Sequence, residues 1–297
     1  MSKPKIGFIG LGLMGSAMVS RLQSLGYPMN VMANRSRTNV EAAVNRGAVE
    51  YPNARELAAA SDIIMLCVDT SDSVEACIYG DAGILAGAKS GALVIDFGTS
   101  LPGSTKKIGA DLAEHKVSYM DAPLGRTPAF ALEGRLNIMA AGSADDFARA
   151  KPVLDDLGEN VFHVGPLGAG HTLKLINNFF ALTTATAMSE AFVMADIAGL
   201  PRQKLYEAMS AGPLHSGMMD FIKANALDGI PDKLAFTISN ARKDIGYYSK
   251  MANDLGVPSK IALGPENALD KANESGWGGR MVAEMVDFFE EQFKPAG

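Results

Sequence analysis

Cysteine is scarce in this chain of 297 residues, which contains only Cys67 and Cys77. Two cysteines cannot build the disulfide framework of a small secreted domain, and Cys67 lies in the apolar run IIMLCV, which we expect to be a buried strand. The scarcity fits a reducing, cytoplasmic location. The first residues, with two lysines before an apolar run, superficially resemble a secretory signal, but the glycines within that run weaken this interpretation.

Three further absences exclude other classes of protein. The four histidines are scattered without metal-ligand spacing, so we expect no metal site. No segment reaches about eighteen uninterrupted apolar residues, so we expect no membrane span. The net charge of −6 argues against nucleic acid or an anionic membrane as a partner. With 47% hydrophobic and 20% charged residues, the composition is that of a globular protein with one large or two ordinary domains.

The first half of the chain alternates short apolar runs with amphipathic segments. The strand-like runs are KIGFIG, PMNVMA, DIIMLCV, ALVIDF, VSYMDAP, LNIMAAG and NVFHV, and the helix-like segments include Gly15–Leu25, Val40–Arg46, Ala54–Ala60 and Gly103–His115. Continuous apolar strands that alternate with helices predict a parallel sheet covered on both faces. We therefore expect residues 1–164 to form a doubly wound α/β domain of the Rossmann type, which binds a dinucleotide.

After Val164 the apolar spacing becomes helical throughout. The stretch GPLGAG predicts a turn or hinge, and His171–Phe192 predicts one long helix that is apolar on most faces. We expect residues 165–297 to form an all-helical domain for substrate binding and dimerisation, opened by this interdomain helix. A helix that is apolar all round must be surrounded by protein. A second subunit is the expected supplier of the missing contacts, in a homodimer or homotetramer.

The segment GLGLMG, from Gly10 to Gly15, follows the first predicted strand and opens a predicted helix. This is the strand–turn–helix context in which a G-x-G-x-x-G motif binds a dinucleotide. Gly10 permits the tight turn, Gly12 lets the backbone approach a pyrophosphate, and Gly15 lets the helix and the strand pack closely. The pyrophosphate would then meet the amide donors at the helix N-terminus.

The end of the second predicted strand bears on the choice between the two nicotinamide cofactors. An NAD site usually has an acidic residue there, which binds the ribose hydroxyl. This chain instead has VMANRSRT, in which Asn34, Arg35, Ser36 and Arg37 provide two guanidinium groups and no carboxylate. Guanidinium groups suit a 2′-phosphate. NADP(H) is therefore the favoured cofactor and NAD(H) the alternative, unless this segment is merely a solvated basic turn.

Four motifs taken together resemble the β-hydroxyacid dehydrogenase family, which includes 3-hydroxyisobutyrate dehydrogenases and tartronate semialdehyde reductases. They are GLGLMGSAM (Gly10–Met18), DAPLGRTPAFALEGRL (Asp121–Leu136), GAGHTLKLINN (Gly168–Asn178) and the pattern of Phe236 followed by Lys243 and Asp244. The resemblance covers essentially the whole chain. It implies an NAD(P)-dependent oxidoreductase that transfers a hydride between the nicotinamide and a small β-hydroxyacid or semialdehyde bearing an anionic group.

The resemblance also implies roles for individual residues. Lys174 would be the catalytic acid/base, since reduction of a carbonyl creates an alkoxide that needs a proton donor, and Asn178, one helical turn further on, would orient the substrate. Desolvation would lower the pKa of Lys174 towards the working range. The local alternative is that Lys174 extends its charge to water. The other implied residues are, for the cofactor, Leu13, Met14, Val68, Thr99 and Lys243, and, for the substrate, Leu124, Gly125, Arg126, Thr127, Asn177 and Asp244.

The predicted substrate loop departs from the family pattern. Where the family usually has Ser-Gly-Gly, this chain has Gly125-Arg126-Thr127, so that a serine is lost and a guanidinium gained. A similar Gly-Arg-Thr sequence occurs in the sulfolactaldehyde reductases of the family, in which the arginine helps to bind a sulfonate. We therefore expect a small anionic aldehyde or hydroxyacid as substrate, with sulfolactaldehyde as one specific candidate. Alternatively, Arg126 forms a structural ion pair with Asp121 or Glu133.

Competing interpretations fit parts of the sequence less well. Lys243 and Asp244 could simply form a solvated helix face. The related 6-phosphogluconate dehydrogenases have a histidine at the position of Asn177 and a much longer helical region. Imine reductases typically replace the lysine at the position of Lys174 with aspartate or tyrosine. A non-catalytic cofactor-binding interaction module would have no need of Lys174.

Overall fold

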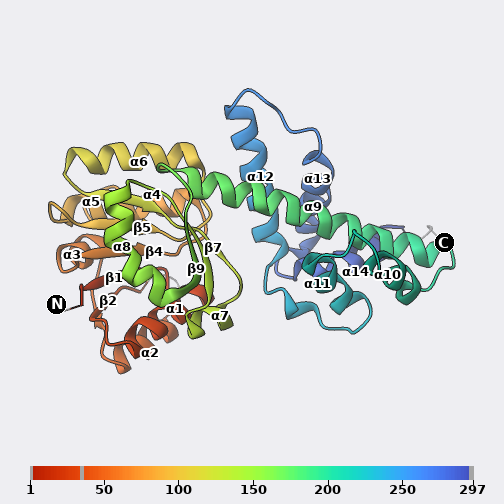
Figure 1. Cartoon of the computed structure of the whole chain (residues 1–297), viewed down its shortest axis with the longest axis horizontal. Helices are drawn as coiled ribbons and strands as arrows, with labels where there is room; N and C mark the ends of the chain where they lie inside the picture. Colours follow the sequence, from red (N-terminus) through yellow and green to blue (C-terminus); the bar gives the residue numbers. More distant parts are fainter. Residues whose placement is uncertain (1–2, 34–36, 294–297) are drawn as a thin grey trace. The chain divides into compact units, whose positions relative to one another are not determined.

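The computed structural model describes residues 3–33 and 37–293, and the chain divides into two compact units, Met1–Lys174 and Leu175–Gly297 (Figure 1). The first unit contains a six-stranded parallel sheet with the strand order β3-β2-β1-β4-β5-β6. Its strands are β1 (Ile6–Ile9), β2 (Met29–Val31), β3 (Val49–Glu50), β4 (Ile63–Leu66), β5 (Leu93–Asp96) and β6 (Ser118–Asp121). This order, which reverses between β1 and β4, is that of doubly wound dinucleotide-binding domains.

Helices cover both faces of this sheet, as the continuous apolar strands predict. They are α1 (Leu13–Ser24), α2 (Arg37–Asn45), α3 (Ala54–Ala59), α4 (Ser71–Ile78), α5 (Ile84–Gly87) and α6 (Pro102–Glu114). Successive side chains of a strand point to opposite faces. In β4, Ile63 and Met65 belong to one buried apolar cluster, whereas Ile64 and Leu66 belong to another. The strand is therefore buried on both sides, and the predicted doubly wound fold is confirmed.

A smaller three-stranded sheet follows in the same unit. It consists of β7 (Leu124–Gly125), β8 (Leu136–Ala140) and β9 (Gly158–His163), with α7 (Pro128–Glu133) and α8 (Ala144–Leu157) between the strands. The runs LNIMAAG and NVFHV are strands, as predicted, but they belong to this second sheet, in which β7 is antiparallel to β8 and β9 is parallel to it. The sequence pattern did not predict β3 or β7, because strands of two residues are too short to show a period.

In its described residues, 175–293, the second unit is helical apart from an isolated bridge between Thr237 and Met281. Its helices are α9 (Ala169–Ile197), whose first residues belong to the first unit, α10 (Arg202–Ser210), α11 (Gly217–Ala226), α12 (Ile238–Asp254), α13 (Leu263–Ala272) and α14 (Met285–Phe293). The predicted helix His171–Phe192 is present within α9. A buried cluster that includes Phe192, Trp277 and Phe288 forms the core of this unit. Among the described residues, no helix is both long and apolar enough to cross a membrane.

Candidate active site

The glycine loop between β1 and α1 has the conformation that its sequence predicts. Gly10 has φ +98°, and a Cβ atom there would lie closer than 3.0 Å to the carbonyl oxygen of Cys67. A Cβ atom on Gly15 would lie closer than 3.0 Å to both the carbonyl oxygen of Gly10 and the ring of Phe8. A side chain at Gly10 would therefore collide with the backbone of Cys67, and one at Gly15 with the backbone of the turn itself.

Gly12 lies at the N-cap of α1 and differs from the other two glycines. It is exposed, and no atom of the described residues lies within 4 Å of the place where its Cβ would be. No side chain in the described part of the chain caps α1, and the first turn of the helix has no acidic residue. Leu13 is 76% exposed there, and Met14 is half-buried. Open space in front of uncapped amide donors fits the pyrophosphate of a dinucleotide.

The residues expected to distinguish NADP from NAD are only partly covered by the structure. Asn34, Arg35 and Ser36 lie outside the described residues. Arg37 begins α2, and its Nη1 lies 2.6 Å from Oε1 of Glu50. Arg37 is engaged in this ion pair. Of the two arginines, Arg35 is therefore the one that stays a candidate for the 2′-phosphate.

Thr99 and Val68, both expected near the cofactor, follow the carboxyl ends of β5 and β4, and both are half-buried. The loop that contains Thr99 is fixed by the buried Asp96, which accepts hydrogen bonds from the amide of Gly98 at 2.8 Å and from the hydroxyl of Ser100 at 2.9 Å. A Cβ atom on Gly98 would lie 2.9 Å from the carbonyl oxygen of Val68. Glycine therefore allows the two loops to approach each other closely.

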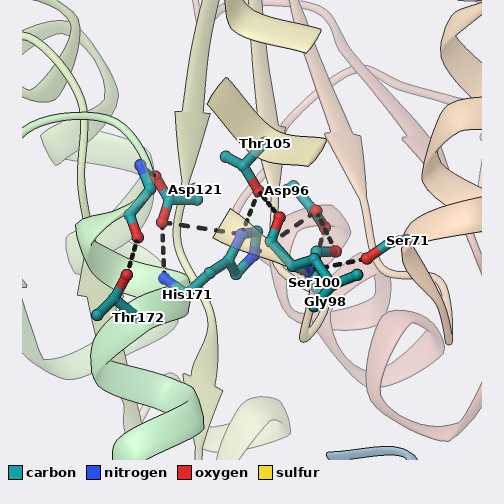
Figure 2. A network of polar contacts seen from close by, with 10 residues as sticks. Ser71, Asp96, Gly98, Ser100, Thr105, Asp121, His171 and Thr172 are labelled. Carbon is teal, nitrogen blue, oxygen red and sulfur yellow. Dashed lines mark hydrogen bonds and ion pairs between the residues drawn. The ribbon is translucent and has the colours of Figure 1, made fainter. Parts of the chain in front are cut away.

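A buried polar network joins the carboxyl ends of the central strands to the start of α9 (Figure 2). Asp121 accepts hydrogen bonds of 2.7 Å from the amides of Gly168 and His171. Nδ1 of His171 lies 2.8 Å from the hydroxyl oxygen of Thr105, and Nε2 lies 3.6 Å from the carboxylate of Asp96. His171, Asp96 and Asp121 are all fully buried. This network fixes the first turn of α9 on the sheet, and the sequence analysis did not predict it.

Lys174 lies one turn further along α9. It is half-buried, and its Nζ donates a hydrogen bond of 2.8 Å to the carbonyl oxygen of Leu124 in β7. The ammonium group therefore lies at the start of the predicted substrate loop, Leu124–Thr127. The alternative that Lys174 extends its charge into bulk water gains no support from this contact.

Arg126 lies between β7 and α7 in an uncommon backbone conformation, with φ +75°. Its Nη1 donates to the carbonyl oxygen of Arg135 at 2.6 Å and to the carboxylate of Glu159 in β9. Its guanidinium also lies over the ring of Phe130, 5.1 Å from the ring centroid. The adjacent Thr127 forms the N-cap of α7 without a side-chain hydrogen bond in the described structure.

The ion-pair partner of Arg126 differs from both partners considered in the sequence analysis. Asp121 is occupied by the backbone amides at the start of α9, and Glu133 pairs with Arg135 at 3.0 Å. Arg126 does form an ion pair, as that alternative expected, but both expected partners were wrong, because the pairing within the small sheet brings Glu159 to the guanidinium instead. The proximity of Arg126 lowers the pKa of the Glu159 carboxyl group.

In the second unit, the site residues predicted on α9 and α12 form a second polar cluster. Nδ2 of Asn178 donates to Oδ2 of Asp244 at 2.6 Å, and Nζ of Lys243 lies 2.9 Å from Oδ1 of the same carboxylate. The side chains of Asp244 and Lys243 are only 3% and 19% exposed. The interpretation of this pair as a solvated helix face was therefore wrong. Asn177 is exposed, and its Nδ2 donates to Oδ1 of Asn178 at 3.2 Å.

Possible metal ligands and the two thiols are the other groups to consider within residues 3–33 and 37–293. No group of three or more His, Cys, Asp or Glu residues there is arranged to hold a metal ion. Burial, followed by the nearby charge of Asp96, raises the pKa of Cys67 to about 12 and that of Cys77 to about 11. Such thiols are poor nucleophiles at neutral pH.

Comparisons with known proteins agree with this arrangement. The family model of the NAD binding domain of 6-phosphogluconate dehydrogenase matches residues 5–165, and the model described as NAD-binding of NADP-dependent 3-hydroxyisobutyrate dehydrogenase matches residues 168–289. The 3-sulfolactaldehyde reductase of Escherichia coli is 32% identical over 273 residues, which span 92% of this chain and 91% of that protein. The 2-(hydroxymethyl)glutarate dehydrogenase of Eubacterium barkeri is 30% identical over 295 residues, which span 97% and 95%.

The fold is shared with a solved structure of 3-hydroxyisobutyrate dehydrogenase from Mycobacterium tuberculosis with L-serine. That structure matches with a TM-score of 0.87 at 23% identity, and the match covers 97% of this chain and 99% of the other. The two family models, the relatives and the glycine loop lead to one conclusion. The chain belongs to the 3-hydroxyisobutyrate dehydrogenase family, and it is an NAD(P)-dependent dehydrogenase or reductase that acts on hydroxyl or aldehyde groups.

Proposed function

We propose that this enzyme interconverts a small anionic semialdehyde and the corresponding β-hydroxyacid, with NADP(H) as the favoured cofactor and Lys174 as the acid/base. The observation that carries the proposal is the position of the Lys174 ammonium group. It is half-buried and lies 2.8 Å from the carbonyl oxygen of Leu124, beside the loop where the substrate is expected. A fixed ammonium group at this place is suited to proton transfer.

Proton transfer by Lys174 complements the hydride that a bound nicotinamide supplies or accepts. In the direction of reduction, Nζ donates a proton to the carbonyl oxygen of the substrate as negative charge develops on it. In the direction of oxidation, the neutral amine accepts the proton of the substrate hydroxyl. The Leu124 carbonyl accepts a hydrogen bond from either form of the amine, so it keeps Nζ in place throughout the reaction.

Asn178 is proposed to orient the substrate. One N–H of its amide is directed to Asp244, and its carbonyl oxygen accepts from Asn177, so the orientation of the amide plane is determined by protein partners. The second N–H of Nδ2 is then the donor suited to a substrate oxygen. A neutral amide can do this without competing with Lys174 for the proton.

The proposed preference for NADP(H) depends on Arg35. Its neighbour Arg37 pairs with Glu50, so the charge of Arg37 is already balanced by a carboxylate. A guanidinium group binds a phosphate through two parallel hydrogen bonds, which a ribose hydroxyl cannot accept in the same way. Arg35 would therefore favour the cofactor that has a 2′-phosphate.

Arg126 is proposed to bind the anionic group of the substrate. The relatives described above are named for 3-sulfolactaldehyde and 2-(hydroxymethyl)glutarate, which carry a sulfonate and carboxylates. A planar guanidinium two residues beyond the carbonyl that holds Lys174 is suited to either group. Sulfolactaldehyde is the specific second candidate, because the Gly125-Arg126-Thr127 sequence resembles that of its reductases and the E. coli reductase is 32% identical to this chain.

A homodimer or homotetramer remains our proposal for the assembly. Several large apolar side chains of α9 are exposed in the single chain, including Phe180 at 71%, Met194 at 51% and Ile176 at 48%. Contiguous apolar residues on an exposed helix face typically mark a protein interface. A second copy of the chain would cover them.

The test is a panel of NADPH-oxidation assays with succinic, tartronic and methylmalonic semialdehydes, glyoxylate and sulfolactaldehyde. In the preferred reaction, Lys174→Ala should lower the single-turnover rate by about 10²–10⁴-fold, the usual contribution of a general acid or base. Binding of NADPH should stay nearly unchanged. Lys151→Ala, which removes a surface lysine paired with Asp155 on α8, is the matched control and should behave as the wild type. A loss of less than about tenfold for Lys174→Ala would refute the assignment.

A further inference from the structure

The backbone of Arg126 is held in a conformation that only a few residues adopt. Apart from glycines, Lys116 and Arg126 are the described residues with positive φ. Lys116 directly follows the end of α6, where a left-handed residue commonly terminates a helix. Arg126 has no such explanation, since it lies between a strand and the N-terminus of α7. Backbone strain of this kind persists where the surrounding structure enforces it, often at a ligand site.

The contacts of Arg126 all involve one end or one face of its guanidinium. Nη1 has two N–H groups and two acceptors, the carbonyl oxygen of Arg135 and the carboxylate of Glu159. The ring of Phe130 lies against one face. Within residues 3–33 and 37–293, Nε and Nη2 have no hydrogen-bond acceptor. These two nitrogens form one of the edges through which arginine binds a carboxylate or sulfonate in a bidentate manner.

Glu159 lies between two paired residues of the small sheet. It lies in β9 at a register shift, between Gly158, which pairs with Leu136 of β8, and Asn160, which pairs with Asn137, and β8 pairs in turn with β7, directly before Arg126. An additional hydrogen bond of 2.9 Å between Asn160 and Asn137 joins β9 to β8 beside it. The backbone of Glu159 is therefore held on both sides by residues paired with β8, which in turn pairs with the strand from which Arg126 extends.

We infer that Glu159 is a positioning residue, which holds the Nη1 end of Arg126 so that the Nε–Nη2 edge is oriented for the anionic group of the substrate. The inference rests on the proposed role of Arg126 in substrate binding. A long side chain that must be ordered by its ligand binds the ligand less tightly than one that is already ordered. Glu159 therefore favours anionic over neutral substrates without contacting either.

The opposite role, in which Glu159 competes with the substrate for Arg126, is disfavoured by the geometry. A competitor would occupy the bidentate edge that the substrate needs. Glu159 instead meets Nη1, together with a backbone carbonyl oxygen that no substrate has to displace. For Glu159→Ala, the positioning role predicts a higher KM for anionic aldehydes, whereas competition predicts a lower one. An experiment can therefore separate the two roles.

The experiment compares Glu159→Ala with Glu133→Ala. Both variants remove one carboxylate near the two arginines, but Glu133 pairs with Arg135 and not with Arg126. KM and kcat are measured for sulfolactaldehyde and succinic semialdehyde, and for propanal as the neutral aldehyde. Glu159→Ala should raise KM for the anionic aldehydes about 2- to 10-fold, the range expected for ordering one long side chain. Its kcat, and both constants for propanal, should stay within about twofold of the wild type.

Two further variants make the role of Glu159 specific. Glu159→Gln retains an acceptor oxygen for Nη1. It should therefore have a KM for the anionic aldehydes close to that of the wild type. In an Arg126→Ala background, Glu159→Ala should have no further effect, because a residue that acts through Arg126 cannot act without it.

The possible failures are distinguishable. If Glu159→Ala behaves as Glu133→Ala, or lowers KM for the anionic aldehydes, the positioning role is refuted while the role of Arg126 stands. If Arg126→Ala itself leaves the preference for anionic over neutral aldehydes unchanged, or no anionic aldehyde is turned over, the proposed function and this inference are refuted together.

Discussion

Alanine substitutions at Gly12 and Gly15 should separate cofactor binding from folding. Both glycines belong to the same loop, and each substitution adds one methyl group. At Gly15 this group would lie closer than 3.0 Å to the backbone carbonyl of Gly10 and to the ring of Phe8. At Gly12 it would meet no atom of the described residues within 4 Å, and the φ of −72° at this position is one that alanine readily adopts.

The two substitutions differ in expected magnitude because only one of them forces atoms to move. In Gly15→Ala, overpacking against a fixed backbone carbonyl costs about 1–3 kcal/mol, and the better helix propensity of alanine offsets only part of this cost. A net loss of about 1–2 kcal/mol corresponds to a decrease in Tm of about 2–8 °C for a unit of this size. Gly12→Ala should leave Tm within about 1 °C of the wild type, as for other substitutions at exposed positions.

The Gly12→Ala variant should bind the cofactor more weakly than the wild type, although its Tm is unchanged. A methyl group in front of the amides of α1 would keep the pyrophosphate from approaching them, and loss of hydrogen bonds to a charged group weakens binding by roughly 10- to 100-fold. Thermal unfolding and titration of NADPH fluorescence measure the two quantities independently. Gly12→Ala with wild-type affinity would show that the pyrophosphate binds elsewhere. Gly15→Ala with an unchanged or higher Tm would refute the packing argument.

Two other predictions address the cofactor and the thiols. Arg35→Ala should weaken NADPH binding roughly 10- to 100-fold and leave NADH binding unchanged, because only the phosphorylated ribose gains a charge-assisted hydrogen bond from it; an equal loss for both cofactors in fluorescence titrations would show that Arg35 does not contact the phosphate. Cys77, whose pKa is raised to about 11 by burial, should be alkylated by iodoacetamide only slowly at pH 8, since roughly one thiol in a thousand is then ionised, and faster as the pH rises towards 11. Alkylation at pH 8 at the rate of a free cysteine, followed by mass spectrometry, would contradict the buried environment.

Much of the fold follows from local features of the sequence. The central strands of the large sheet, β1, β4 and β5, are apolar runs because both of their faces are buried, so they stand out from the helices between them. The glycine loop is recognisable because two of its glycines are required by steric contacts, whereas the third leaves open space in front of α1. In contrast, β7 is two residues long and is defined by its pairing with β8 rather than by its composition.

The environment of Arg126 could not be derived in the same way. The partners expected from the sequence, Asp121 and Glu133, are the acidic residues close to Arg126 along the chain. The actual partner is 33 residues away, in β9. Its proximity depends on the register between β8 and β9, and that register includes a bulge between Leu136 and Asn137. A one-residue shift would turn Glu159 to the other face of the sheet, so the contact follows from tertiary pairing and not from the pattern of either segment.

The buried network around His171 shows why the ends of parallel strands attract such clusters. Asp96 and Asp121 end neighbouring strands and lie opposite each other in register, so two carboxylates meet in the interior. Buried carboxylates need compensating donors. The amide of Gly98 and the hydroxyl of Ser100 provide them for Asp96, and the amides of Gly168 and His171 provide them for Asp121. Satisfying the two carboxylates thus fixes the position of the loop expected at the cofactor and of the helix that carries Lys174.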